Sequence, residues 1–144
     1  NKVAQVVFCH PDDSHKILEE IQKNSELLLK KLGIPYRVVS ICSGDMGSIA
    51  SKKYDIEAWF PREKEYKEVT SASNCTAYQA VSLNIKYKSD DGKAYLHTLN
   101  NTAIATSRTM RAILENYQLK DGSVKVPAAL KKYMNGISKI ESKV

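Results

Sequence analysis

Cysteines are few in this sequence and have no paired spacing. Cys9, Cys42 and Cys75 are the only three, and they lie far apart, which argues against a structural zinc site and against a disulfide framework. We expect reduced, partly buried thiols. The chain also lacks a hydrophobic run long enough to span a bilayer and a basic-then-apolar leader. A cytoplasmic protein with no membrane contact is therefore predicted.

The sequence has no block of like charge, no internal repeat and no low-complexity linker. Lys and Arg number 22 against 16 Asp and Glu, and the excess is scattered along the chain. This balance indicates tolerance for anionic ligands but no dedicated nucleic-acid surface. With 144 residues, 42% of them hydrophobic, the chain suits one domain with a single core. It opens at Asn1, inside an expected strand and without an initiator methionine, which suggests a fragment or a processed product.

Strands and helices are expected to alternate along the chain. An amphipathic helix begins near residues 11–14, with Asp12 or Asp13 as its cap, and ends at Gly33. The last helix covers about 103–117, with Met110 and Leu114 on its apolar side. The expected strands are 2–9, 36–42, 54–60, 67–74, 83–88 and 93–100. Strands joined by hairpins and short helices favour an α+β fold, an antiparallel β-sheet flanked by helices.

Residues 99–109 carry the first functional signal. A strand is predicted to end here in polar residues, of which Asn101 or Thr102 would cap the helix that follows. Arg108 stands early in that helix, where the helix dipole and a planar guanidinium both favour a phosphate. A merely solvated arginine on an exposed helix face is the alternative.

A second signal lies in residues 54–61 (Y-D-I-E-A-W-F-P) and 66–76 (Y-K-E-V-T-S-A-S-N-C-T). Together with residues 99–118, these segments closely resemble the C-terminal half of the catalytic domain of the seryl-tRNA synthetases, which are class II aminoacyl-tRNA synthetases. The resemblance covers residues 1–134, and 135–144 form a C-terminal tail. Ala103 and Thr106 stand where many members have glycine. This variant resembles archaeal-type and some bacterial members. The resemblance implies a partial class II catalytic core that binds ATP and an amino acid on the open face of its sheet.

The resemblance also implies roles for individual residues. Glu68 would act on the ATP phosphates through Mg²⁺, since a carboxylate meets a triphosphate favourably only with a cation between them. Arg108 matches the arginine of the family's motif 3 and would hold the γ-phosphate, so that Glu68 and Arg108 should share one cleft. Asn100 and Thr102 correspond to residues of the serine pocket. The implied ATP-binding residues are Glu68, Val69, Thr70, Ser71 and Arg108.

Structural alternatives remain open for both charged residues. Glu68 could be a solvated strand residue on the same face as Thr70 and Asn74. Arg108 could pair with Glu115 or with an aspartate instead of a ligand. The reaction implied by the resemblance needs no side-chain nucleophile, and none is assigned.

The chain departs from the family pattern at several positions. Ala4 stands where the family typically has a glutamate that contacts the amino group of serine. Ala77 stands where an aspartate is common, and Val81 and Ser82 replace arginines. Two hypotheses follow: part of a working serine–tRNA ligase, or a synthetase-like paralogue that has lost catalysis and serves as a binding or regulatory module.

The family has further parts that would precede Asn1. They are the motif 1 dimer interface, the motif 2 arginine that clamps the α-phosphate, and an N-terminal arm that holds the tRNA. The fragment alone is therefore expected to be inactive, since small displacements already cost about 10²-fold in rate. In the full-length enzyme, a homodimer acting on serine, ATP and tRNA(Ser) is expected.

Overall fold

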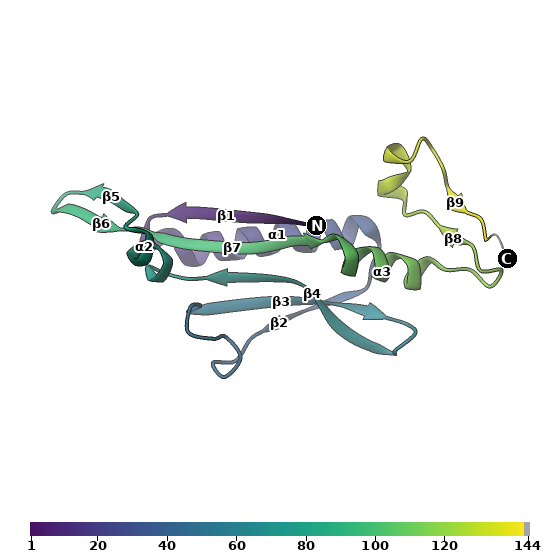
Figure 1. Cartoon of the computed structure of the whole chain (residues 1–144), viewed down its shortest axis with the longest axis horizontal. Helices are drawn as coiled ribbons and strands as arrows, with labels where there is room; N and C mark the ends of the chain where they lie inside the picture. The colour runs from purple at the N-terminus through teal and green to yellow at the C-terminus, as the bar shows by residue number, and fades with distance from the viewer. Residues whose placement is uncertain (143–144) are drawn as a thin grey trace.

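A five-stranded antiparallel sheet organises the chain (Figure 1), and the computed structural model describes residues 1–142. In sheet order its strands are β1 (Lys2–Cys9), β7 (His97–Ala105), β4 (Glu65–Asn74), β3 (Lys52–Phe60) and β2 (Tyr36–Ser40). All neighbouring strands are antiparallel. The expected α+β fold is confirmed, and most expected strands lie within a few residues of their predicted bounds.

Helix α1 (Ser14–Leu32) covers one face of this sheet, behind the strands in Figure 1. Its buried Leu18 and Ile21 pack with Leu99 of β7, so that the predicted apolar stripe becomes the core. Asp13 stands at the N-cap of α1, one of the two positions expected, but without the expected capping hydrogen bond. A short 3-10 turn, η1 (Pro11–Asp13), precedes α1, and His10 accepts the N–H of Asp12 instead.

Strand β7 runs further than predicted. It continues to Ala105, and helix α3 (Thr106–Tyr117) begins only there, so Asn101 and Thr102 do not cap a helix. The ladders to β1 and β4 outweigh the local capping preference of these polar residues. The buried residues of α3 are Thr109 and Ala112, whereas Met110 and Leu114, which were expected on its apolar side, are exposed.

Asn101 has a structural role that the sequence did not reveal. Its side chain is fully buried, and its Nδ2 donates to the carbonyl of Ile21 at 2.6 Å and to Oγ of Ser25 at 2.7 Å. These bonds join β7 to the middle of α1. The buried amide therefore fixes the position of α1 beneath β7, the strand that carries Asn100 and Thr102, the two residues expected to bind serine.

The variant Asn101→Ala is expected to lower the free energy of unfolding by about 2–3 kcal/mol, because two buried hydrogen bonds are lost and a cavity remains. Urea unfolding followed by circular dichroism measures the change. Asn24→Ala is the matched control, because Asn24 bonds only to Gln5 in an exposed position, and it should cost about 0.5 kcal/mol. Equal losses for both variants would contradict the role given to Asn101.

Strand β4 contains a bulge that changes which residues share a face. Ile56 pairs with Thr70 while the next residue, Glu57, pairs with Glu68, so that Val69 has no partner in β3. Val69 and Thr70 are consequently both buried, and Glu68 points to the opposite face. The expectation that Glu68 shares a face with Thr70 and Asn74 is wrong, because strict alternation does not survive a bulge.

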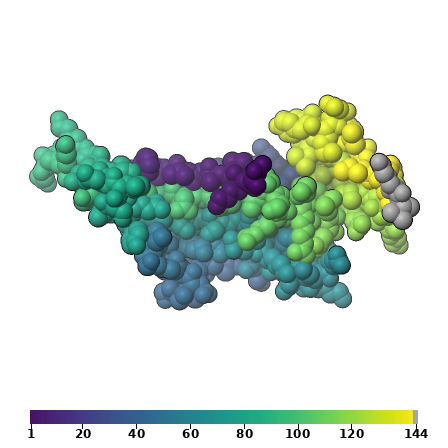
Figure 2. Space-filling model, viewed as in Figure 1, coloured from purple at the N-terminus to yellow at the C-terminus, as the bar shows by residue number. Residues whose placement is uncertain are grey.

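The remaining elements extend the fold at its two ends (Figure 2). At one end, α2 (Tyr78–Leu83) is followed by the hairpin of β5 (Lys86–Ser89) and β6 (Gly92–Tyr95), which confirms the predicted turn. At the other end, β8 (Val124–Lys125), the 3-10 helix η2 (Ala128–Tyr133) and β9 (Lys139–Ile140) follow α3. Because β9 pairs with β8, the chain beyond 134 remains in contact with the preceding segment. No helix among residues 1–142 is both long enough and apolar enough to cross a membrane.

Candidate active site

The face of the sheet that points away from α1 is lined with polar side chains. Asp55 of β3 pairs with Ser71 of β4, and Ser73 of β4 pairs both with Lys53 of β3 and with Asn100 of β7. Cross-strand partners point to the same face. The alternation of three adjacent strands therefore places these groups side by side on what we call the open face.

Glu68 and Arg108 meet at one end of the open face. Nη1 of Arg108 lies 3.3 Å from Oε1 of Glu68 and donates to the Glu68 backbone carbonyl at 3.2 Å. Both residues line a cleft of about 470 Å³ together with Thr102 and Ser107. The structure thus brings together the carboxylate and the guanidinium that were expected to converge.

The Glu68–Arg108 ion pair is open to exchange with a ligand. Their side chains are 46% and 55% exposed, and exposed pairs contribute at most about 1 kcal/mol. Arg108 is also the third residue of α3, and the dipole at the N-terminus of a helix favours an anion near its first turn. A phosphate could replace the Glu68 carboxylate as the partner of Arg108 at small cost. The alternative pairing of Arg108 with Glu115 is wrong, because Glu115 pairs with Arg111.

The carboxylate of Glu68 is compatible with a divalent ion only when other ligands are supplied. Across residues 1–142, no group of three or more His, Cys, Asp or Glu side chains is arranged to hold a metal. Hard divalent cations need several oxygen ligands, which phosphate oxygens and water can provide. Glu68 therefore fits a cation that arrives with a bound triphosphate, but not a resident metal site.

The other predicted site residues are divided between two clefts and the core. Ser71 and Asn100 line a second cleft of about 270 Å³ on the open face. Val69 and Thr70 are 1% exposed, so their side chains are unavailable and only their backbone can meet a ligand. Lining residues that sequence reasoning missed are Met46, Ile49, Ala50, Lys53, Ser73, Cys75 and Gln79. For Lys53 and Ser73 the signal was the period-two alternation of β3 and β4, which was not carried across the sheet.

Asn100 is held in place at the second cleft. Its Nδ2 donates to Sγ of Cys75 at 3.4 Å. Burial raises the pKa of the Cys75 thiol, so the sulfur stays protonated and unreactive at neutral pH. Cys75 therefore supports the amide of Asn100 and does not serve as a nucleophile.

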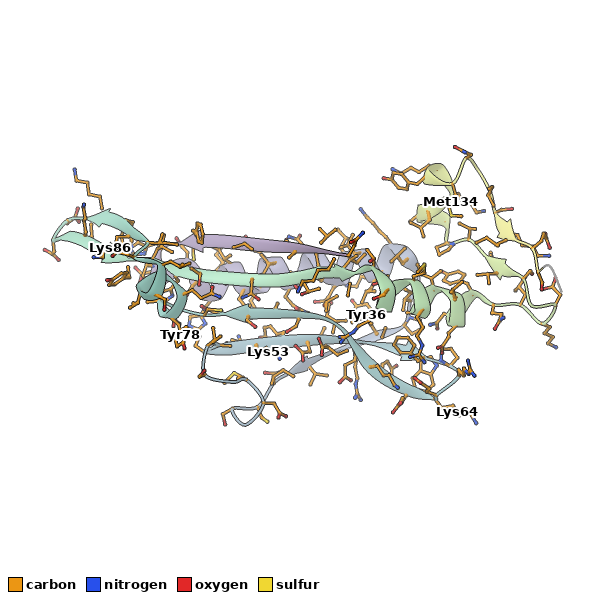
Figure 3. The ribbon with its side chains drawn as sticks, viewed as in Figure 1. Tyr36, Lys53, Lys64, Tyr78, Lys86 and Met134 are labelled. Carbon is orange, nitrogen blue, oxygen red and sulfur yellow. The ribbon has the colours of Figure 1, made fainter. Side chains whose placement is uncertain are left out.

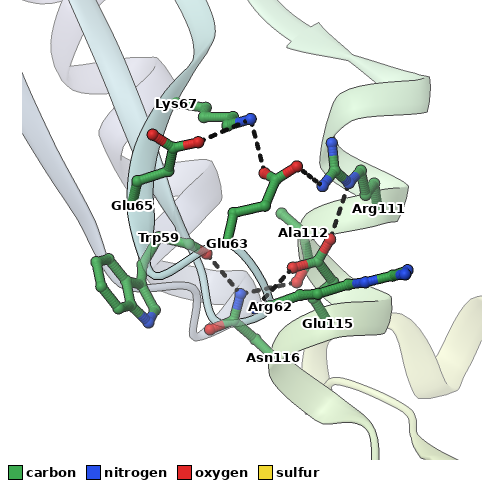
Figure 4. Close-up of polar contacts among 9 residues, drawn as sticks. All are labelled: Trp59, Arg62, Glu63, Glu65, Lys67, Arg111, Ala112, Glu115 and Asn116. Atoms are coloured by element: carbon green, nitrogen blue, oxygen red, sulfur yellow. Dashed lines mark hydrogen bonds and ion pairs between the residues drawn. The ribbon is translucent and has the colours of Figure 1, made fainter.

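A network of ion pairs attaches the turn between β3 and β4 to α3 (Figure 4). Glu63 of the turn accepts from Lys67 at 2.7 Å and from Arg111 of α3 at 2.8 Å. Arg111 also pairs with Glu115, whose carboxylate accepts the backbone N–H of Arg62. Arg111 lies one helical turn after Arg108, so this network holds in place the helix that carries Arg108.

The network gives the chain a pH-dependent stability. Hydrogen bonds from Lys67 and then Arg111 lower the pKa of Glu63 from its ordinary 4.5. A lowered pKa in the folded state means that the stabilisation is complete above pH 4.5 and is lost as the pH falls through the lowered value. We expect the Tm of the wild type to exceed that of Glu63→Gln at neutral pH, with the difference disappearing in acid. A difference that is independent of pH would contradict the ionic role of Glu63.

Comparison with known proteins places these features among relatives. The family model described as the tRNA synthetase class II core domain (G, H, P, S and T) matches residues 1–117. The serine–tRNA ligase of Methanocella arvoryzae is 62% identical over 140 residues, which cover 95% of this chain and 33% of that protein. That of Methanospirillum hungatei is 62% identical over 138 residues, which cover 94% and 32%. The chain thus spans about a third of the length of the curated relatives it matches.

Solved structures give the same result for the fold. The seryl-tRNA synthetase from Pyrococcus horikoshii complexed with ATP matches with a TM-score of 0.95 and 51% identity, over 99% of this chain and 32% of that one. The cytoplasmic serine–tRNA ligase from Naegleria fowleri in complex with AMP matches with a TM-score of 0.93 and 44% identity, over 99% and 34%.

Proposed function

The chain belongs to the family of class II tRNA synthetase core domains, and we propose that it forms the C-terminal half of the catalytic domain of a serine–tRNA ligase. The observation that carries this proposal is the meeting of Glu68 and Arg108 in one cleft beside Thr102. The relatives are serine–tRNA ligases, and one of the similar structures is a complex with ATP. The proposed substrates are serine, ATP and tRNA(Ser).

In this mechanism Arg108 holds the γ-phosphate of ATP. The serine carboxylate attacks the α-phosphate, the bond to the β-phosphate breaks, and seryl-adenylate and pyrophosphate form. Once bound to the γ-phosphate, the guanidinium stabilises the negative charge that builds up on the leaving pyrophosphate. A hydroxyl of the terminal ribose of tRNA then attacks the seryl carbonyl and releases AMP.

Glu68 has a different role in the same step. A Mg²⁺ ion bound with ATP would neutralise phosphate charge and orient the triphosphate, and Glu68 would supply one oxygen to it. The carboxylate becomes free for this role when Arg108 changes its partner from Glu68 to the γ-phosphate. Breaking the exposed pair costs little. ATP can therefore separate the two side chains, and it would bind Arg108 directly and Glu68 through Mg²⁺.

Asn100 and Thr102 are proposed to recognise serine. They lie two residues apart on β7, so their side chains point to the same face. Asn100 faces the second cleft and Thr102 the first. Serine bound between them would place its carboxylate toward the triphosphate and its hydroxyl toward hydrogen-bonding groups, which a serine-specific site requires.

The whole enzyme is proposed to be a cytoplasmic homodimer. The lengths of the relatives indicate that each of its chains is about three times as long as this one. The motif 2 arginine and the tRNA-binding arm would lie in that additional length. These 144 residues alone are therefore expected to show no measurable exchange activity.

A second candidate function is a paralogue without catalysis, and Ala4 is the observation that favours it. Ala4 pairs with Thr102 across β1 and β7, so a family glutamate there would reach the serine pocket. Ala77 argues less strongly, because it stands at the N-cap of α2 and makes no side-chain cap. An aspartate at that position would cap α2, so its replacement by Ala77 affects the stability of α2 and is weaker evidence for a loss of catalysis.

Serine-dependent exchange of pyrophosphate with ATP tests the proposal on the full-length protein. Robust exchange that requires serine supports the ligase. Absence of exchange in a folded full-length protein would leave the paralogue as the better account. Exchange with alanine or threonine in place of serine is the control for amino-acid specificity.

A further inference from the structure

The β5–β6 hairpin projects beyond the end of the sheet, where Lys86 is labelled in Figure 3. In its register Lys86 pairs with Tyr95, and Lys88 pairs with Lys93. Because paired residues share a face and alternate residues do too, one face of the hairpin carries three lysines and a tyrosine. We call this the lysine face.

The lysine face has an electrostatic cost without compensation inside the protein. Lys88 and Lys93 stand directly opposite one another, and like charges in that position destabilise a two-stranded ribbon. Neither forms an ion pair or hydrogen bond with any residue in 1–142, although Asp90 and Asp91 occupy the turn between them. Lys86 is held over the ring of Tyr95 at 4.7 Å, which keeps its ammonium on the same face.

The opposite face of the hairpin is fixed to the body of the protein. The hydroxyl of Tyr87 lies 3.0 Å from Nε2 of His10, and the two rings stack edge to face with centroids 5.0 Å apart. Tyr87 lies on the face opposite the lysines. This contact turns the lysine face outward and preorganises it.

We infer that the lysine face binds the sugar–phosphate backbone of tRNA, an inference that rests on the proposed ligase function. Lys86 and Lys88 are spaced by two strand residues, or about 6.8 Å, which lets them contact neighbouring phosphates of one strand. An RNA backbone supplies regularly spaced charges to a rigid ribbon, whereas an acidic peptide would have to order its side chains to do so.

The linear sequence indicated no nucleic-acid surface because these lysines are separated by acidic turn residues. Folding into a hairpin places the lysines on one face and leaves Asp90 and Asp91 at the tip. The hairpin precedes β7, whereas Arg108 follows it, so roughly 25 Å of strand separates the lysine face from the proposed ATP cleft. Binding of tRNA at the hairpin can therefore be changed without altering serine activation.

The test measures the salt dependence of tRNA(Ser) binding. Fluorescence anisotropy with a labelled transcript would compare the wild type, K88Q/K93Q and the control K23Q/K31Q, which removes two exposed α1 charges. For K88Q/K93Q, Kd should rise about tenfold. The slope of log Kobs against log salt should become shallower by about 1.5, because each of the two lost phosphate contacts accounts for about 0.7–0.9 of that slope. The control should match the wild type.

Further measurements separate the outcomes. Thermal unfolding of K88Q/K93Q should occur at an equal or higher temperature, because a like-charge pair is removed. In the full-length enzyme this variant should retain serine-dependent pyrophosphate exchange and lose tRNA affinity. An unchanged slope with exchange intact overturns the inference alone, and absence of exchange in the wild type overturns the proposed function. Equal competition by polyglutamate of matched charge would also overturn the inference about the lysine face, in favour of an acidic protein partner.

Discussion

Replacing Arg108 by alanine is expected to reduce serine-dependent pyrophosphate exchange in the full-length enzyme by about 10³-fold or more, the scale at which a single arginine acts in phosphoryl transfer. The γ-phosphate would lose the guanidinium that holds it. The negative charge of Glu68 beside it would no longer be opposed by Arg108. Both changes weaken the binding of the triphosphate, so the loss should fall mainly on kcat/KM for ATP. Steady-state exchange at varied ATP concentration measures it.

Arg62 provides the matched control for this variant. It is an exposed arginine near the same helix, and only its backbone N–H is bonded to α3. Arg62→Ala should retain exchange within about twofold, as expected of a surface substitution. Arg108→Lys should recover part of the activity, because an ammonium keeps the charge but loses the planar fork. Full activity in a folded Arg108→Ala variant would refute the role assigned to the Glu68–Arg108 cleft.

Loss of activity in Arg108→Ala should not come with loss of folding. The ion pair with Glu68 is half-exposed, and the burial of α3 depends on Thr109 and Ala112. The network of Arg111 with Glu63 and Glu115 remains in place. Tm should therefore change by only a few degrees, and thermal unfolding separates a catalytic effect from a structural one.

The sheet was predictable from the sequence because its strands alternate clearly. In β3 the buried Ile56, Ala58 and Phe60 separate polar residues, and Pro61 ends the strand. Similarly, Gly33 ends α1 in the left-handed conformation, at φ 67°, where a Cβ would collide with the hydroxyl of Tyr117. The alternation in β3 and the glycine that ends α1 are both readable from neighbouring residues, although the contact of Gly33 with Tyr117 is not.

The errors arose where a distant partner decides the local structure. Asparagine is a residue type that favours helix caps, but the groups that accept hydrogen bonds from the Asn101 amide lie on α1, 76 and 80 positions away in sequence. The bulge at Val69 depends on the register between β3 and β4. Neither a cap preference nor a period of two contains this information. The start of α3 and the face of Glu68 were therefore predicted wrongly.

The candidate site was predictable in part for the same reason. Glu68 and Arg108 come from segments whose resemblance fixed their roles, and the structure brings them into contact. The second cleft was missed because its lining comes from loop residues, from strands β3, β4 and β7, and from α2, which meet only in the fold. Lys53 and Ser73 become neighbours of Asn100 through strand pairing.

The second large effect is expected from Ala4→Glu in the full-length enzyme. Ala4 is exposed on β1 and lies opposite Thr102 on β7, so a glutamate there would point over the proposed serine pocket. A carboxylate that accepts a hydrogen bond from the serine ammonium contributes about 1.5–3 kcal/mol. We expect KM for serine to fall about 10- to 100-fold. Exchange measured at varied serine concentration gives this value.

Ala4→Gln separates charge from size in this experiment. Glutamine fills the same space and can accept a hydrogen bond, but it has no charge to offer an ammonium, so it should recover at most a small part of the gain. The direction of the result also decides between the two candidate functions. A site that is complete except for Ala4 becomes more active when one carboxylate is added, whereas a paralogue that has lost catalysis stays inactive with the pair of Glu68 and Arg108 intact. An unchanged KM in Ala4→Glu, with exchange still present, would mean that serine binds away from Thr102.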